Sequence, residues 1–162
     1  MGRTPSLRGG TAPALPDLFG SPDDPMTALE RRAEELFPDQ HVIVWEGDPA
    51  TFQFSFVSRS AEAVLGHPPE RWIDEPAFWA DHVVHPDDRS DAVAYCALAT
   101  CKGADHAFEY RARRRDGGVV WLLDIVRVLV GPRNLPVSLR GVMFDISAAK
   151  QADGTYRDAA AE

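Results

Sequence analysis

Apolar and polar residues alternate along three consecutive runs in the second half of the chain, at 106–114, 119–130 and 137–147. Alternation with a period of two is typical of β-strands, because successive side chains of a strand point to opposite faces of its sheet. Asp116 and Gly117, between the first two runs, form a dipeptide that favours a tight hairpin turn. The pattern therefore predicts three sequential, antiparallel strands.

Two earlier strands are predicted at 41–48 and 52–58, joined by the turn-forming sequence DPAT. Between this hairpin and the later strands, the chain carries signals for short helices and then for one longer helix at 86–103. The helices thus fall in the middle of the chain. The order predicts an α+β fold, a five-stranded antiparallel sheet with short helices and one longer helix on one face.

An amphipathic helix is predicted before the first strand, at 27–37. Thr27 and Glu30, three residues apart, fit a capping box at its start. Residues 1–25 are so rich in proline and glycine that no regular element is expected there. The apolar stripe of the helix consists of Leu29, Ala33, Leu36 and Phe37.

The sequence HVVHPDDR contains residues that could bind a metal ion or begin the long helix. A zinc or iron site would need His82 and His85 on one helical face, with a carboxylate nearby. The proline after His85 keeps that residue out of helical dihedral angles, so the two imidazoles diverge. Asp87 and Asp88 fall in the first helical turn, where the helix dipole stabilises each carboxylate by about 0.3–1 kcal/mol. The pattern favours a helix start, and no metal site is predicted.

Composition narrows the functional classes. The formal net charge of −8 argues against a nucleic-acid or anionic-membrane surface. No apolar run approaches the ~20 residues that span a bilayer, and prolines and glycines interrupt the N-terminus before any secretory signal, so a cytoplasmic location is expected. Cys96 and Cys101 lie five residues apart in one predicted helix. Their side chains point roughly 140° apart, so no disulfide between them is expected.

The run at 119–130 is apolar on both faces, which a sheet open to water on one side does not show. Its outer face must therefore be covered, by the 27–37 helix, by a second subunit, or by both. We expect a symmetric homodimer through this face. The residues assigned to the dimer face are Leu29, Leu36, Trp121, Leu123, Ile125, Val142 and Phe144.

Four motifs together resemble a PAS domain with its C-terminal PAC half. FEYRARRRDGGVVW at 108–121 matches the family's E-Y-R-x-x-R-x-D-G-x-x-x-W pattern, and LRGVMFDIS at 139–147 resembles its closing L-x-G-x-x-x-D-I-T strand. FVSRSAEAVLG at 56–66 resembles F-V-N-x-A-x-x-x-L-G, and HPDDR at 85–89 opens the long helix. The resemblance covers about 41–147 and implies the PAS fold.

The resemblance also divides the chain. We expect a disordered tail at 1–25, the amphipathic capping helix at 26–39 and the PAS/PAC domain at 40–148. Residues 149–162 would be a C-terminal tail or the start of a signalling linker.

The family's known cofactor classes fit this sequence poorly. The flavin-binding light sensors carry a reactive cysteine in a G-R-N-C-R-F-L-Q segment before the long helix, and this chain has no such segment. Oxygen-sensing haem members usually take an axial histidine from the long helix, but residues 89–102 contain none. The resemblance therefore disfavours covalent flavin and axial-histidine haem, and it names no other cofactor.

Family geometry implies a small-molecule cavity between the sheet and the middle helices. Asp124 is unusual there, because it is an acidic residue on an inward-facing position. A buried carboxylate without a partner costs much free energy, so we expect a hydrogen bond or a raised pKa. Asp124 either anchors a polar ligand or pairs with a neighbouring Arg, His or backbone group. The candidate cavity residues are Trp72, Phe78, Trp79, His82, Tyr110, Leu122, Asp124 and Met143.

The resemblance implies a non-catalytic sensory module that binds a small ligand or partner. Its signal would pass through dimerisation and the C-terminal strand, leaving at Asp145, Ile146 and Ser147. Because family members often precede histidine kinases or cyclases, an effector such as the histidine kinase of a two-component system is the expected partner. The alternative is a small α+β enzyme of the isomerase or hydratase type, with Asp124 or His82 as base. One buried carboxylate without a positioned electrophile is weak support for it.

Overall fold

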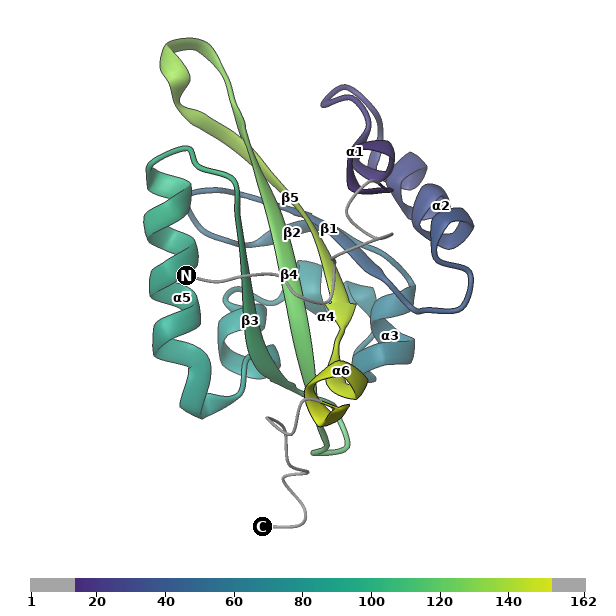
Figure 1. Cartoon of the computed structure of the whole chain (residues 1–162). Coiled ribbons are helices and arrows are strands. Elements are labelled where there is room, and N and C mark those ends of the chain that lie inside the picture. The colour runs from purple at the N-terminus through teal and green to yellow at the C-terminus, as the bar shows by residue number, and fades with distance from the viewer. Residues whose placement is uncertain (1–13, 153–162) are drawn as a thin grey trace.

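A five-stranded antiparallel sheet forms the centre of the computed structural model, which describes residues 14–152 (Figure 1). Its strand order is β2-β1-β5-β4-β3, so the last strand lies between the first hairpin and the later one. The predicted α+β fold with five antiparallel strands is confirmed. The strands are β1 (Ile43–Gly47), β2 (Phe54–Val57), β3 (His106–Arg113), β4 (Val119–Val130) and β5 (Pro136–Asp145).

Helices lie on both faces of this sheet (Figure 1). The inner face packs against the middle helices, and the outer face packs against two N-terminal helices. Between β4 and β5 the chain makes the 3₁₀ turn η3 (Pro132–Asn134), and α6 (Ser147–Ala152) follows β5. The middle helices are α3 (Ser60–Leu65), α4 (Pro69–Asp74), the π-helical turn η2 (Trp79–Val83) and α5 (Pro86–Cys101), and the N-terminal ones are α1 (Ala14–Phe19) and α2 (Met26–Leu36).

Strands β1, β4 and β5 contribute buried side chains to two cores, and the apolar residues on both faces of 119–130 predicted this for β4. The inner core, between the sheet and the middle helices, contains Tyr110 and Leu122. The outer core, between the sheet and α1–α2, contains Leu123 and Val142. A helix pair of the same chain therefore explains why β4 is apolar on both faces.

Helix α1 contradicts the expectation that residues 1–25 hold no regular element. Leu18 is fully buried and Phe19 is 4% exposed, both in the outer core. The guanidinium of Arg127 lies 4.4 Å from the Phe19 ring centroid. Burial against the sheet thus stabilises a short helix that local propensity alone disfavours. The rest of the predicted tail before Ala14, and 153–162, lie outside the described residues.

The predicted capping box at the start of α2 is also wrong. Pro25 is the N-cap, in an extended conformation, and no side chain caps the helix. Glu30 instead accepts a hydrogen bond from the backbone N–H of Arg59 at 2.8 Å, which ties α2 to the start of α3. Glu30 therefore bonds to a residue of a distant segment instead of to the start of its own helix.

Most of the residues assigned to a dimer face are buried within the single chain. Leu29, Leu123 and Val142 are fully buried, and Phe144 is 3% exposed. Trp121 and Ile125 are half-buried, while Leu36, at the end of α2, is 38% exposed and does not complete the predicted apolar stripe. The apolar pattern that suggested a dimer is therefore largely satisfied by α1 and α2.

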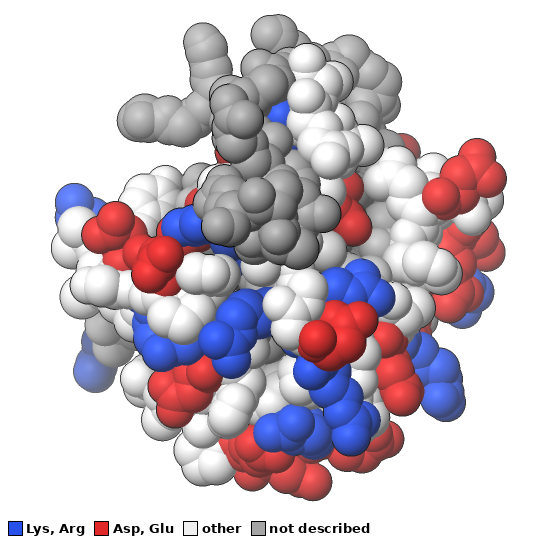
Figure 2. All heavy atoms as spheres, turned by 90° about the horizontal axis from the view of Figure 1, so that it is seen from below, with Lys and Arg blue, Asp and Glu red and all other residues white. Residues whose placement is uncertain are grey.

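The surface carries charges of both signs. Seen from below, acidic and basic side chains are interspersed over the described part of the molecule (Figure 2). Among residues 14–152, no helix is long and apolar enough to cross a membrane.

Candidate functional site

Asp124, in the middle of β4, is the centre of a buried hydrogen-bonded network on the inner face. Its side chain is 1% exposed. Oδ1 accepts a hydrogen bond from Trp45 Nε1 at 3.1 Å, and Oδ2 accepts one from the Tyr110 hydroxyl at 2.8 Å. The Tyr110 oxygen in turn accepts from Trp79 Nε1 at 2.9 Å. One carboxylate thus joins β1, β3, β4 and η2.

Burial sets the protonation of this network. Desolvation raises the pKa of Asp124 to about 7, although the hydrogen bonds from Tyr110 and Trp45 favour the charged form. Burial and the nearby carboxylate also raise the pKa of the Tyr110 hydroxyl well above its ordinary value. Asp124 therefore changes charge near neutral pH while Tyr110 stays protonated.

The partners of Asp124 were only partly anticipated. A hydrogen bond or a raised pKa was predicted, and both are present. The partners are, however, neither Arg, His nor backbone, since the two donors are the uncharged side chains of Trp45 and Tyr110. Tyr110 shares the inner face with Asp124, as the alternation indicated, whereas Trp45 comes from the distant first strand.

Gly141 makes the Trp45 contact possible. It is the register partner of Trp45 across the β1–β5 pair. A Cβ at Gly141 would overlap the indole ring of Trp45, so only glycine leaves the ring room to lie over β5. The glycine of the LRG sequence therefore has a packing role that places the indole nitrogen beside Asp124.

A small cavity lies next to Asp124. Its volume is about 20 Å³, enough for about one water molecule. Sites for drug-sized ligands usually have roughly 300–1,000 Å³. A flavin or a haem does not fit this cavity in the present conformation. The lining residues are Trp45, Gly47, Phe52, Phe54, Trp79, Cys96, Asp124, Leu139 and Met143.

Cys96 is a cavity residue that sequence reasoning missed. Burial and the nearby Asp124 raise the pKa of its thiol to about 12, so it stays protonated and is a poor nucleophile. Sγ lies 3.4 Å from His106 Nε2. Ala92, Cys96 and Thr100 are the buried positions of α5 and follow one another at intervals of four. That helical spacing is the signal that could have placed Cys96 against the sheet. Both Cys96 and Cys101 are free cysteines.

The predicted cavity residues other than His82 fall into three groups. Trp79, Asp124 and Met143 line the cavity, and Tyr110 belongs to the network beside it. A further set is buried in the inner core without lining the cavity, namely Trp72, Phe78 and Leu122.

His82 does not reach the cavity, and its prediction as a cavity residue is wrong. Its side chain is 49% exposed, and Nε2 lies 3.9 Å from a carboxylate oxygen of Glu75. The π-helical turn η2 buries Trp79 and Val83 and leaves His82 on the solvent side.

The first hairpin supplies lining residues that sequence reasoning overlooked. Trp45, Phe52 and Phe54 come from β1, β2 and the turn between them. Trp45 and Ile43 alternate with outward positions in β1, and this period of two could have assigned them to the inner core.

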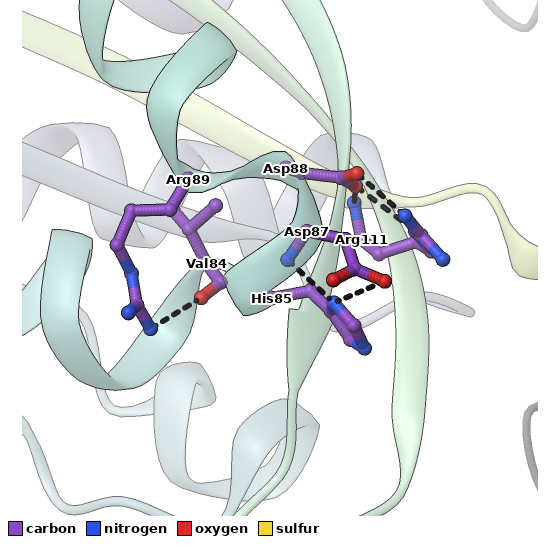
Figure 3. Close-up of polar contacts among 6 residues, drawn as sticks. All are labelled: Val84, His85, Asp87, Asp88, Arg89 and Arg111. Atoms are coloured by element: carbon purple, nitrogen blue, oxygen red, sulfur yellow. Dashed lines mark hydrogen bonds and ion pairs between the residues drawn. The ribbon is translucent and has the colours of Figure 1, made fainter.

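The HVVHPDDR stretch begins α5, as the sequence favoured (Figure 3). His85 is the N-cap, and its Nδ1 accepts a hydrogen bond from the backbone N–H of Asp87 at 3.1 Å. Asp88 accepts from the Arg111 backbone N–H at 2.8 Å and pairs with its guanidinium at 2.6 Å. Within the described residues, no group of three or more His, Cys, Asp or Glu side chains is placed to hold a metal ion.

The residues assigned to signal output join β5 to β4. The Ile146 N–H donates to the Trp121 carbonyl, and the Trp121 N–H donates to Ser147 Oγ, both at 2.9 Å. Asp145 Oδ1 accepts from the Ser147 N–H at 2.9 Å, at the start of α6. Trp121 lies three residues before Asp124, so β4 carries both the Asp124 network and the residue that contacts Ile146 and Ser147.

Comparisons with known proteins agree with this geometry. The pattern of the family described as PAS fold matches residues 54–143. The N-terminal domain of a diguanylate cyclase with PAS/PAC sensor from Marinobacter aquaeolei is 35% identical, with a TM-score of 0.62, covering 67% of this chain and 97% of that one. No curated protein matches.

Two other solved structures share the fold. A sensory box histidine kinase/response regulator from Burkholderia thailandensis is 21% identical, with a TM-score of 0.61, covering 76% of this chain and 90% of that one. A domain of a putative light and redox sensing histidine kinase from Haloarcula marismortui is 19% identical, with a TM-score of 0.59, covering 72% and 98%. With the family pattern matching more than half of the sequence, the chain belongs to the PAS-fold family.

Proposed function

We propose that this PAS domain is a non-catalytic sensory module. In this proposal a small ligand at the Asp124 cavity changes the hydrogen-bonded network, and the sheet relays the change to an effector. The observation that carries the proposal is one fully buried carboxylate, held by aromatic donors from separate elements, beside a cavity.

The size of the cavity restricts how a ligand binds. With about 20 Å³ available, anything larger than water must displace lining side chains, among which are Trp45, Phe52 and Trp79. Phe52 is a good candidate because it has a φ of 61°, which is strained for a residue with a side chain, and it is half-buried on the β1–β2 turn. A ligand that moves Trp45 or Trp79 also breaks a hydrogen bond of the network. Binding that displaces either indole is therefore coupled to the network, whereas displacement of Phe52 alone would leave both of these hydrogen bonds in place.

The relay follows β4 to the exit. A shift of Asp124 moves the start of the same strand, where the backbone of Trp121 bonds to the Ile146 N–H and to the Ser147 hydroxyl. α6 begins at Ser147, so its direction depends on these contacts.

An effector of the cyclase or histidine kinase class fits the proposal. Similar domains occur in a diguanylate cyclase and in histidine kinases, which supports a partner of this kind within the same chain or in another. A homodimer through the outer face is also part of the proposal. It requires α1 and α2 to contribute to the interface, because they already cover Leu123 and Val142.

A small enzyme with a cavity acid has less support. Both oxygens of Asp124 accept hydrogen bonds from the protein itself, and His82, the other proposed base, lies on the surface.

Native mass spectrometry and an absorption spectrum of the purified chain test the proposal. We expect a co-purified small molecule, or a thermal shift with at least one member of a metabolite panel, that Asp124→Asn abolishes. Asp81→Asn, the same change at an exposed site, should leave binding intact. Equal binding by Asp124→Asn with unchanged circular dichroism would refute the assignment of the site. If no small molecule co-purifies and no member of the metabolite panel gives a thermal shift, ligand sensing is refuted.

A further inference from the structure

A surface groove of about 300 Å³ lies between α5 and β3, where α5 runs alongside the edge of the sheet (Figure 1). Its lining includes Asp91 and Tyr95 from α5 and Phe108 and Glu109 from β3. We propose that this groove docks an extended peptide segment of a partner protein that presents a basic side chain. The proposal goes beyond ligand sensing, because docking there does not require an occupied cavity.

The backbone of β3 offers the first argument. β3 is the last strand of the sheet, so one of its edges has no neighbouring strand among residues 14–152. On that edge the Arg111 N–H donates to Asp88, and the Arg111 carbonyl accepts from the His85 N–H at 2.9 Å. Because backbone groups alternate in direction along a strand, those of Ala107 and Glu109 point to the same edge. The Ala107 carbonyl already accepts a hydrogen bond from the Tyr95 hydroxyl at 3.5 Å, so an added strand would pair with the Ala107 N–H and with both backbone groups of Glu109.

The protein's own chain limits the length of this open edge. Val84 forms a bridge with Ala112, and the Arg111 groups are already used, so that end of β3 is closed. The open groups lie within 107–109, which suits an added segment of roughly three to four residues at about 3.3 Å per residue. The site is therefore suited to a short extended stretch.

Charge gives the partner's chemistry. Asp88 is paired with Arg111, and Glu109 is paired with Lys150, each at 2.6 Å. Asp91 is exposed and forms no ion pair within the described residues. It leaves one uncompensated carboxylate at the groove, in a chain of net charge −8. A Lys or Arg side chain complements this charge.

Aromatic side chains complete the match to a basic residue. Tyr95 is 47% exposed, and its ring centroid lies 5.4 Å from that of Phe108. Such rings attract a cation and pack against its methylene stem. Together with the open strand edge, they favour a peptide over a free small cation, which would leave the backbone groups unused.

Docking would also affect α6, the helix that begins at the proposed signal-output residue Ser147. Lys150 of α6 pairs with Glu109 at the groove and lies 4.6 Å from the Trp121 ring. A basic side chain bound in the groove competes with Lys150 for Glu109. Peptide docking therefore weakens one of the contacts that hold α6 against the sheet.

The test is a titration of the ¹⁵N-labelled full chain, followed by NMR, with the peptide acetyl-VKVRV-amide. We expect the backbone amides of Ala107 and Glu109 to shift at millimolar peptide, followed by those of α6. Asp91→Asn should weaken binding roughly three- to tenfold by loss of the carboxylate, whereas Asp81→Asn, a matched change outside the groove, should not. The acidic peptide acetyl-VEVEV-amide should not bind.

A backbone N-methylated form of the basic peptide provides the control for strand pairing and leaves the protein unaltered. It should fail to shift Ala107 and Glu109, because it lacks the donors needed for an added strand. Equal binding by the methylated peptide, or the absence of groove shifts at several millimolar of the unmodified peptide, overturns the proposal.

Discussion

Trp45 and Asp124 lie 79 residues apart in the sequence, and the indole Nε1 of Trp45 donates a 3.1 Å hydrogen bond to the Asp124 carboxylate. This contact is formed across β5, which lies between β1 and β4 in the sheet. It depends on Gly141, the β5 residue over which the indole ring lies. Trp45 is opposite Gly141 in the sheet, and Gly141 is opposite Val126, so the indole reaches Asp124 diagonally, two residues along β4.

Gly141→Ala should destabilise the fold and disturb the network. The new Cβ would overlap the Trp45 ring, which must move away from Asp124. Forced repacking of this kind costs about 1–3 kcal/mol in the free energy of unfolding, measured by denaturant titration. Tryptophan fluorescence should change with it. Gly118→Ala, whose Cβ would contact only the side chains of Arg114 and Asp116 in the exposed hairpin, is the matched control and should cost far less.

The stability of the protein should depend on pH through Asp124. Its pKa is about 7 in the folded state, against an ordinary value of 3.8. Between about pH 4 and 7 the folded state therefore holds a proton that the unfolded state has lost, so the free energy of unfolding falls as pH rises, by up to about 4 kcal/mol. Above pH 7 this contribution is gone.

Denaturant titrations across pH 4–8 check this sign. The pKa of Asp88 is lowered, so its contribution to the free energy of unfolding has the opposite pH dependence and is lost only at more acidic pH. The difference between the unmodified chain and Asp124→Asn isolates the Asp124 contribution. That difference should decline steadily up to about pH 7. A constant difference would show that Asp124 does not titrate in this range.

The sequence carried enough information for the sheet and for the inward position of Asp124, because strand alternation depends only on local order. It did not carry the identity of the donors, since the pairing of β1 with β5 is a long-range contact. His82 was assigned to the cavity from family geometry alone, which does not say which side chains of the middle helices point inward, and the π-helical turn buries Trp79 and Val83 instead. Helix α1 was missed because its local sequence signals are weak and its stability comes from burial against the sheet, which is a tertiary contact.

Leu18→Ala tests whether α1 is part of the folded unit. Leu18 is fully buried in the outer core, so its truncation should cost about 2–4 kcal/mol in the free energy of unfolding. A disordered tail would give no change. Leu36→Ala, at an exposed position of α2, is the control and should cost well under 1 kcal/mol.

Removal of residues 1–37 should expose the outer face of the sheet. Leu123, Val142 and Phe144 would then lose the cover that α1 and α2 provide. Exposed apolar surface of this extent favours self-association, which light scattering at tens of micromolar would detect as a mass above that of the monomer. The same measurement on the full chain tests the proposed homodimer. A monomeric full chain beside an associating truncated chain would assign the apolar face to the helices rather than to a subunit interface.

Ser147→Ala tests the coupling between β4 and the exit helix. Ser147 Oγ accepts the hydrogen bond of the Trp121 N–H at 2.9 Å, and its removal leaves that half-buried donor without this acceptor. The cost should be about 1 kcal/mol, seen as faster hydrogen exchange at Trp121 and in α6. Ser55→Ala, which removes an exposed hydroxyl from β2, should leave the exchange of both unchanged. Unaltered exchange in Ser147→Ala would mean that α6 is held by other contacts, such as the Lys150–Glu109 ion pair, and that the serine does not couple it to β4.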